Sequence, residues 1–322
     1  MSPLSGLLDP MLKLILFGGK GGVGKTTFAS SAGVYLAGKG KKTLLVSTDP
    51  AHSLSDSLGT QIGGAIKNAG VAGLDALEIN AEKEFSAFKA QYDRQLRGLF
   101  ETSSYLDSED VDAILSQQLP GMDEVMGLKR VIELVREGEY DKYVVDTAPT
   151  GHALRLLHLP ELLDQWIKAV SKIRWKYRYM VTRFSGSYRP DAADDLLVSM
   201  KKWVIHMGEA LKDQRLCEFI AVTIPEAMAV EETARLIDSI RRYGIRIRHL
   251  IINNIFPMDS CAFCAEKRKG QERYIRAMKE RFSFSGFELN VVEIPLQPNE
   301  IRGIEALKKI GGIAFAEHAP AV

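Results

Sequence analysis

The sequence predicts an α/β fold built on a mostly parallel β-sheet. Short apolar runs typical of buried strands alternate with stretches that carry apolar residues at helical spacing. A glycine-rich loop follows the first apolar run, and two later runs each end on an aspartate. Because parallel strands need long crossover connections, this alternation indicates a sheet with helices on both faces.

The predicted strands are short runs rich in β-branched residues. They are Leu12–Phe17, Thr43–Thr48, Leu74–Asn80, Lys142–Thr147, Phe219–Ile224, His249–Ile255 and Asn290–Ile294. In such sheets ligands bind beyond the carboxyl ends of the strands. The glycine loop and the two aspartate-bearing segments therefore converge on one edge.

Two connections are longer than a crossover requires, and both have helical periodicity: Ala81–Asp141 and His152–Leu216. We expect them to pack together as a helical subdomain, with Pro120, Pro160 and Pro190 at helix starts. The prediction is a helical subdomain of residues 81–141 and 152–216 inserted into a core of residues 1–80, 142–151 and 217–322.

Composition excludes several classes of protein. The 322 residues carry 42 basic and 41 acidic side chains, so no global field attracts nucleic acid or anionic lipid. No apolar run approaches the roughly 20 residues that span a bilayer, and Met1–Leu16 lacks the features of a signal peptide. Three cysteines are too few for a disulfide framework in a chain of this length. We expect a soluble, cytoplasmic protein.

The loop from Gly19 to Thr26 fits the phosphate-binding pattern G-x-x-x-x-G-K-[ST]. Glycines let consecutive N–H groups point at phosphate oxygens, and the helix N-terminus adds partial positive charge. Lys25 would reach the β- and γ-phosphates, and the Thr26 hydroxyl would hold Mg²⁺. The alternative is an ordinary glycine turn before a helix. The predicted nucleotide contacts of this loop are Gly19, Lys20, Gly21, Gly22, Val23, Gly24, Lys25, Thr26 and Thr27.

Carboxylates at strand ends are candidates for magnesium binding and for catalysis. Asp146 would hold Mg²⁺ directly or through water, although a strand-end aspartate can also simply cap a turn. Asp56 is the candidate that orients the attacking water. Asp49 competes for that role, but its place at a strand end before Pro50 favours Mg²⁺ or the loop.

Two further features remain open from the residues alone. Lys20 is a second lysine in the loop, and it is either solvated or a cation that reaches a phosphate across a dimer interface. Cys261 and Cys264 form a CxxC pair, which supplies two of the four ligands of structural zinc. A second copy of the chain would complete that set, while an iron–sulfur cluster, a redox pair and an unligated pair are alternatives.

Three motifs together resemble the arsenite-pump ATPase family: GKGGVGKTT, STDPAHSLSD (Ser47–Asp56) and DTAPTGHALR (Asp146–Arg155). The closer resemblance is to its single-domain branch, which targets tail-anchored membrane proteins in the guided-entry pathway. The resemblance implies a P-loop ATPase that uses ATP and Mg²⁺ and opens and closes as a homodimer. It also implies zinc at the dimer axis on Cys261 and Cys264, water activation by Asp56 and a trans-acting Lys20.

The same resemblance implies contacts to the base of the nucleotide by Asn253 at a strand end and by the segment that contains Pro295, and a further nucleotide contact by Glu226 after Pro225. The partners it implies are hydrophobic tail-anchor helices of client proteins, with a membrane receptor possible and no nucleic acid. Methionines in the helical subdomain suit variable apolar ligands, but for any single one an ordinary core position is the better interpretation.

Other functions compete with this one. The chain could energise an arsenite or antimonite efflux pump, although it has one P-loop and its third cysteine, Cys217, stands at a strand start. It could be an iron–sulfur scaffold ATPase. A membrane-cycling partition ATPase ranks last, because the only terminal amphipathic candidate, Gly303–Phe315, is weak and broken by Gly311-Gly312.

Overall fold

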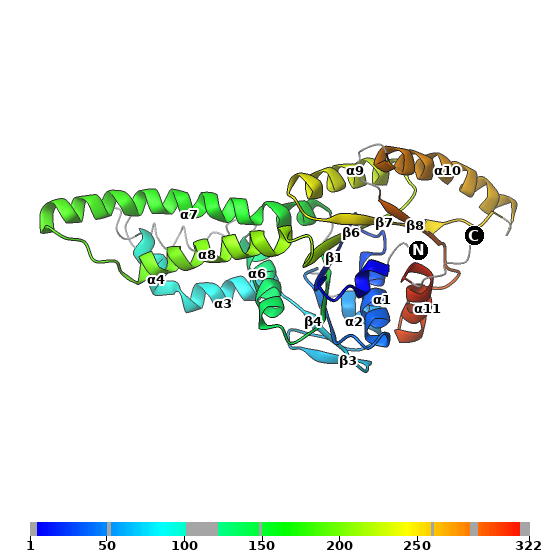
Figure 1. The fold of residues 1–322 in the computed structure, drawn as a ribbon, viewed down its shortest axis with the longest axis horizontal. Helices are drawn as coiled ribbons and strands as arrows, with labels where there is room; N and C mark the ends of the chain where they lie inside the picture. The colour runs from blue at the N-terminus through cyan, green and yellow to red at the C-terminus, as the bar shows by residue number, and fades with distance from the viewer. Residues whose placement is uncertain are drawn as a thin grey trace. The chain divides into compact units, whose positions relative to one another are not determined.

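The computed structural model describes residues 5–49, 53–100, 122–147, 150–258, 261–283 and 289–315. Its described strands form one eight-stranded sheet (Figure 1). The order across the sheet is β3 (Lys67–Val71), β4 (Leu74–Glu78), β2 (Thr43–Ser47), β5 (Lys142–Asp146), β1 (Leu14–Gly18), β6 (Cys217–Thr223), β7 (Ile247–Ile255) and β8 (Asn290–Pro295). All neighbours are parallel except β3 and β4. The predicted α/β fold with a mostly parallel sheet is confirmed.

Strand β3 is the one element of the sheet that the sequence analysis missed. Its residues KNAGV are largely exposed at the sheet edge, so they lack the apolar run that marks a buried strand. Gly70 and Gly73 take positive φ of 81° and 79° and turn the chain into the antiparallel pairing with β4.

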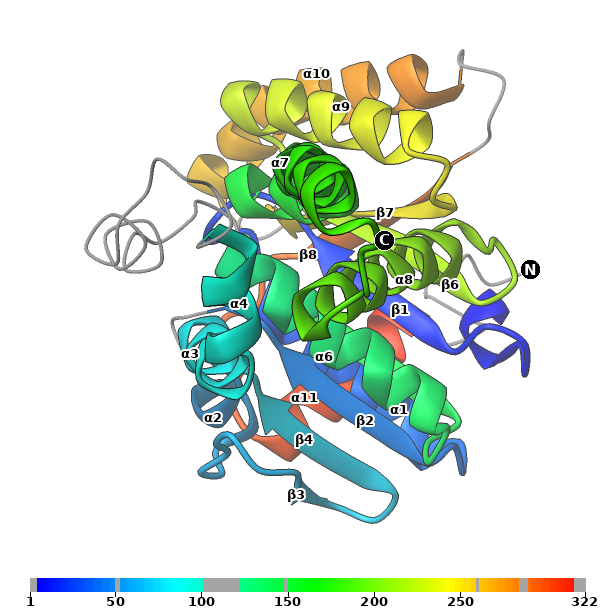
Figure 2. The same cartoon turned by 90° about the vertical axis from the view of Figure 1, so that its left-hand side faces the viewer.

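The chain divides into two compact units: residues 1–79, 133–154 and 210–322, and residues 80–132 and 155–209. The first, the nucleotide unit, contains the sheet and the short 3₁₀ helix Ser5–Leu8. Helices α1 (Lys25–Gly38), α2 (Ser53–Leu58) and α11 (Ile304–Phe315) share its main apolar core, while α9 (Ala227–Arg242) and α10 (Ala262–Ser283) pack on the other face (Figure 2).

Helix α11 runs through the two glycines that were expected to interrupt it. A Cβ at Gly311 would lie 3.2 Å from the carbonyl oxygen of Ser31, so glycine there permits the close packing of α11 on α1. Leu307, Ile310 and Phe315 are buried in this contact. The apolar side of α11 is thus part of the core rather than an exposed membrane anchor.

The second, helical unit draws on α3 (Ala81–Gln91), α4 (Asp93–Phe100), α6 (Met122–Glu137), α7 (Thr150–Ser185) and α8 (Ala192–Lys212). The Trp203 ring lies 5.8 Å from the Phe88 ring and 4.6 Å from Nζ of Lys129, so α3, α6 and α8 meet around it. Helix α7 continues through Pro160, where the sequence predicted a helix start. None of the described helices has the length and apolarity that a bilayer crossing requires.

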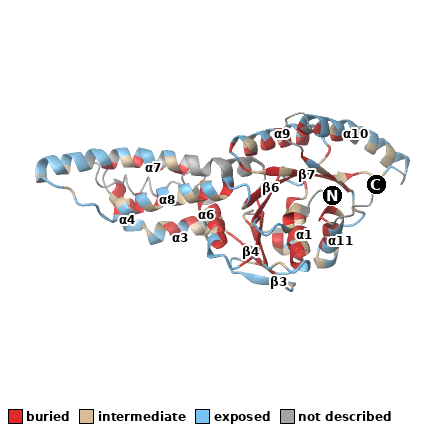
Figure 3. Ribbon diagram, viewed as in Figure 1, coloured by how far each residue is buried: buried red, intermediate tan, exposed pale blue. Residues whose placement is uncertain are grey.

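The methionines of the helical unit are mostly core residues. Met126, Met200 and Met207 are at most 3% exposed, whereas Met180 is 43% exposed. The side chain of Met122, like Pro120, lies outside the described residues. Strands β4, β6 and β7 are mostly red in Figure 3, whereas β3 and the outward faces of α7 and α10 are largely pale blue.

Candidate nucleotide site

The phosphate-binding loop joins the end of β1 to the start of α1. Two of its positions require glycine for steric reasons. A Cβ at Gly19 would lie 2.1 Å from the carbonyl oxygen of Val222, and a Cβ at Gly24 would lie 2.7 Å from Nδ2 of Asn253. Gly24 also has φ of 101°, which an L side chain rarely adopts. Backbone packing against β6 and β7 therefore fixes the shape of the loop.

Lys25 lies inside the curl of this loop. Its Nζ donates to the carbonyl oxygen of Lys20 at 3.2 Å, and the residue is only 5% exposed. Burial lowers the pKa of Lys25, while the charges of Asp146 and Asp49 oppose that change. A cationic group is thus held in advance where phosphate oxygens would enter.

Asp146 ends β5 beside the loop, because β5 pairs with β1 in the register that places Asp146 opposite Phe17. Thr26 Oγ1 donates to Asp146 Oδ2 at 2.7 Å. The other oxygen, Oδ1, is buried and has no hydrogen-bond partner among the described residues. Burial raises the pKa of Asp146 to about 7 and Asp49 adds to that rise, whereas Thr26 and Lys25 lower it.

This arrangement fits a divalent cation. A buried carboxylate oxygen without a partner is costly, and a bound metal ion or its water would satisfy it. Asp49 acts electrostatically on both Lys25 and Asp146, so the structure groups these three residues with Thr26. Thr26, Asp49 and Asp146 would thus supply the oxygen ligands that Mg²⁺ prefers, next to Lys25 for phosphate.

Asp56 and Lys20 lie outside that group. The Asp56 side chain is 83% exposed, and its described partner is Arg302, whose Nη2 lies 3.5 Å from Oδ1. Lys20 is one-third exposed, and its Nζ lies 3.9 Å from Oε1 of Glu232 on α9. Oε2 of Glu232 is buried and lacks a hydrogen-bond partner within the described part of the chain. Neither Arg302 nor Glu232 carried a local sequence signal, because both contacts join segments far apart in the chain.

The predicted nucleotide contacts outside the phosphate loop lie at or just beyond the ends of β7, β8 and β6. Asn253 is buried and its Nδ2 donates to the carbonyl oxygen of Val23 at 3.0 Å, which ties β7 to the phosphate loop. Ile255 pairs with Pro295 at the end of β8. Asn253 is thus in direct contact with the loop, and Pro295 is one strand away.

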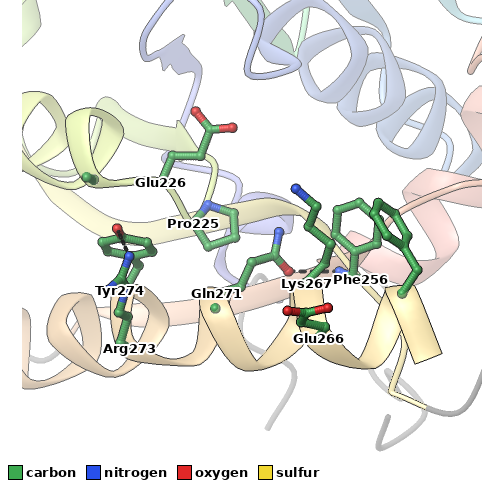
Figure 4. Close-up of a pocket in the computed structure, with 11 residues that line it drawn as sticks. Pro225, Glu226, Phe256, Glu266, Lys267, Gln271, Arg273 and Tyr274 are labelled. Carbon is green, nitrogen blue, oxygen red and sulfur yellow. Dashed lines mark hydrogen bonds between the residues drawn. The ribbon is translucent and has the colours of Figure 1, made fainter. Parts of the chain in front are cut away.

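Glu226 precedes α9 and lines a pocket of about 520 Å³ between the ends of α9 and α10 (Figure 4). Gln271 lies in its wall and makes two hydrogen bonds of 2.9 Å, from Nε2 to the carbonyl oxygen of Asn254 and from the Phe256 N–H to Oε1. Gln271 thereby fastens α10 to the end of β7 beside Asn253. The sequence analysis missed this residue, because nothing in the pattern of α10 distinguishes it from other polar surface positions.

Comparison with known proteins identifies the group to which the chain is related. The profile of a family described as "Anion-transporting ATPase" matches residues 12–315. This chain belongs to that family. It is 35% identical over 316 residues to "ATPase ASNA1 homolog 2" of Paramecium tetraurelia, covering 94% of this chain and 93% of that protein. It is 37% identical over 328 residues to "ATPase GET3B" of Arabidopsis thaliana, covering 94% and 79%. With "ATPase get3" of Neurospora crassa the identity is 32% over 332 residues, covering 98% and 95%.

These findings confirm the resemblance to the arsenite-pump ATPase family. The protein is an ATPase, and its ligands are ATP and Mg²⁺. Within the family the relatives are ASNA1 and GET3 ATPases of nearly the same length, which agrees with the single-domain branch. The roles of the individual site residues stay predictions.

The CxxC pair of this ATPase opens α10. The two sulfurs lie 3.1 Å apart, and the Cys264 N–H donates to Sγ of Cys261 at 3.2 Å. No group of three or more metal-binding side chains occurs among the described residues, so one chain supplies this place with two thiols. Cys217 is buried at the start of β6, and burial raises the pKa of its thiol well above the ordinary range.

Proposed function

We propose that this ATPase binds and delivers membrane proteins that carry a C-terminal anchor helix. The observation that carries the proposal is the nearly full-length likeness to ATPases named GET3 and ASNA1, added to the motif resemblance described above. The helical unit is the candidate client-binding part. Val198 and Ile205, one heptad apart on α8, are 54% and 47% exposed and offer apolar surface to an anchor helix.

The test is capture of an anchor helix in solution. The ATPase would be mixed with a purified tail-anchored substrate, and a soluble complex would be sought by size-exclusion chromatography with and without ATP. The matched control substrate has polar residues in the anchor. The proposal predicts a complex with the apolar anchor alone, followed by ATP-dependent transfer to vesicles. Aggregation of the substrate at every nucleotide state would contradict it.

We further propose that the chemistry is shared between residues of one chain and one lysine of its partner. Mg²⁺ would be held by Thr26 and Asp146, and through water by Asp49. When bound, the ion neutralises charge on the phosphates. Lys25 and the loop amides bind the phosphates, and Asp56 orients the attacking water. Asn253 and Pro295 contact the base, and Glu226 makes a further contact to the nucleotide. Closure of the dimer would move Lys20 from Glu232 to the partner's nucleotide.

The same homodimer would share zinc. One CxxC pair provides two thiolates, and a two-fold axis would double them to the four that structural zinc requires. Metal analysis coupled to mass measurement tests this directly: one zinc per two chains is expected. A brown, iron-containing protein would favour the scaffold function instead.

A second candidate function follows from the description of the matching family as anion-transporting. In that case arsenite or antimonite would stimulate hydrolysis. The burial of Cys217 leaves Cys261 and Cys264 as the accessible thiols, which argues for the delivery function. Stimulation of ATP hydrolysis by arsenite that a Cys261→Ser variant loses, while its basal hydrolysis stays unchanged, would favour the pump.

A further inference from the structure

The exposed face of α7 combines cationic and aromatic side chains in the helical unit. Lys168, Lys172, Trp175, Tyr179 and Arg183 are all exposed. At 3.6 residues per turn their spacings of four, three, four and four residues place them on one side of the helix. Leu163, Ile167, Val170 and Arg174 form the opposite, buried side. This exposed stripe, together with Lys176, is called the basic face below.

The basic face is locally strong although the whole chain is nearly neutral, with a net charge of +1. Between residues 163 and 185 the only acidic residue is Asp164, and its partner is Lys168, whose Nζ lies 2.5 Å away. Among the described residues neither Lys172 nor Lys176 has an ion-pair partner. The surplus positive charge therefore faces solvent, where it can attract an anionic partner.

Aromatic rings lie between these charges. Trp175 is 66% exposed and Tyr179 is 56% exposed, and their rings stack with centroids 6.1 Å apart. Arg183 Nη1 donates to the Tyr179 hydroxyl at 3.4 Å. Phe184, near the end of the helix, is 86% exposed. Exposing this much aromatic surface to water is unfavourable, which indicates a surface that is covered in the working protein.

A hollow of about 650 Å³ runs beside Trp175. Ile167 and Ser171 form part of it, and Lys172, Lys176 and, from α8, Lys201 surround it. An apolar floor with a rim of lysines suits a ligand that has an anionic head on an apolar body.

We propose that the basic face of α7 binds the surface of an anionic lipid bilayer. Tryptophan and tyrosine favour the headgroup level of a bilayer, and lysines beside them are attracted to anionic lipids. The stripe from Lys168 to Arg183 extends for roughly 22 Å along the helix, which suits a repeating array of headgroups better than a single small anion. The proposal does not require that the chain carries a client.

Vesicle flotation tests the proposal with the full-length protein. Vesicles of phosphatidylcholine alone would be compared with vesicles containing about one-third phosphatidylglycerol, at low and at physiological salt. Binding is expected only with phosphatidylglycerol and is expected to weaken with salt. The Lys172→Glu/Lys176→Glu variant should bind at least about 25-fold more weakly, since the loss of each lysine charge costs about fivefold and the added carboxylates repel anionic lipid further. The matched control, Lys83→Glu/Lys309→Glu, reverses two exposed lysines elsewhere and should change binding by less than about twofold.

A second measurement distinguishes insertion of the basic face into the bilayer surface from electrostatic attraction to that surface. The vesicle-induced blue shift of tryptophan emission should disappear in Trp175→Phe, which keeps its binding. Thermal unfolding confirms that each variant folds. Equal binding to both vesicles, or no effect of the double reversal, would overturn the proposal. Retention on a polyglutamate column without vesicle binding at the same salt would overturn it in favour of an acidic protein partner.

Discussion

The two units of the molecule each bury a charged side chain, but they differ in whether its polar atoms have hydrogen-bond partners. In the nucleotide unit, Asp146 is fully buried with one oxygen bonded to Thr26 and the other without a partner among the described residues. In the helical unit, Arg174 is 2% exposed and contacts Asp191, Asp194 at 3.2 Å, the Gly98 carbonyl oxygen at 3.0 Å and the Tyr188 hydroxyl at 3.2 Å. A satisfied buried charge stabilises the fold, whereas an incompletely satisfied one marks a place for a ligand.

The electrostatics agree with that contrast. Burial alone would raise the pKa of Asp194, but hydrogen bonds from Tyr188 and Arg174 bring it below its ordinary value. For Asp146 burial prevails and the pKa rises to about 7. The protein thus stabilises the ionised form of one carboxylate and leaves the other dependent on an added cation.

The largest effect is expected from removing the charge of Asp146. Asp146→Asn should lower ATP hydrolysis on the order of a thousandfold, because the magnesium contribution is worth several kcal/mol. The thermal midpoint of the nucleotide-free protein should stay the same or rise, since an unsatisfied buried charge is removed. An Asp146→Asn variant that hydrolyses ATP normally, or that unfolds at a much lower temperature, would contradict the view that Asp146 serves a ligand rather than the stability of the fold.

Arg174→Met should instead destabilise the helical unit by about 1–3 kcal/mol, because it removes the hydrogen bonds of the buried guanidinium to half-buried Asp194, to the Gly98 carbonyl oxygen and to Tyr188. Urea unfolding followed by tryptophan fluorescence measures this. The matched control is Arg178→Met, four residues along, where the exposed guanidinium only lies over the Tyr188 ring at 4.8 Å. Its expected cost is at most about 1 kcal/mol. Similar losses in the two variants would mean that the Arg174 cluster has no special role.

Lys142 is a third buried charge that can be compared with Asp146 and Arg174. Its Nζ donates to the carbonyl oxygens of Asp9 and Leu12, and burial lowers its pKa from 10.5 to about 8. Between those two values the unfolded chain binds more protons, so the contribution of Lys142 to stability rises with pH. The unfolding free energy of the wild type relative to Lys142→Met should increase by roughly 1–3 kcal/mol from pH 7 to pH 10.5. A flat or falling difference would contradict this.

The smallest effect is expected at Gln271. Gln271→Ala removes the partners of the Asn254 carbonyl and the Phe256 N–H, at a cost of about 1–2 kcal/mol. Hydrogen exchange at the Phe256 amide should accelerate while exchange in β1 stays unchanged. Gln271→Glu keeps the acceptor for Phe256 and should protect that amide. Unaltered exchange in Gln271→Ala would show that α10 is held to β7 by other contacts.

Local pattern predicted the elements whose signals are local. The strand, loop and helix around Lys25 follow from glycine spacing and an apolar run, and Asp146 follows from the end of another run. Contacts between distant segments were not predictable. Arg174 stands in a basic stretch of α7 where no local pattern distinguishes it, because its partners Asp191 and Asp194 lie beyond the end of that helix. The ion pairs Asp56–Arg302 and Lys20–Glu232 also join segments that lie far apart in the sequence, so no local pattern predicted them.

Sharing of a lysine between two copies of the chain is the central claim, and mixing two inactive variants tests it most directly. Lys20→Ala keeps its own Lys25 but supplies no lysine to its partner, whereas Lys25→Met has a defective site but supplies Lys20. If Lys20 acts across the dimer, the mixture should recover about one quarter of wild-type ATP hydrolysis, because half of the dimers are mixed and each has one complete site. No recovery in a mixture proven to contain mixed dimers would contradict the account. It would indicate that Lys20 acts on the nucleotide bound to its own chain.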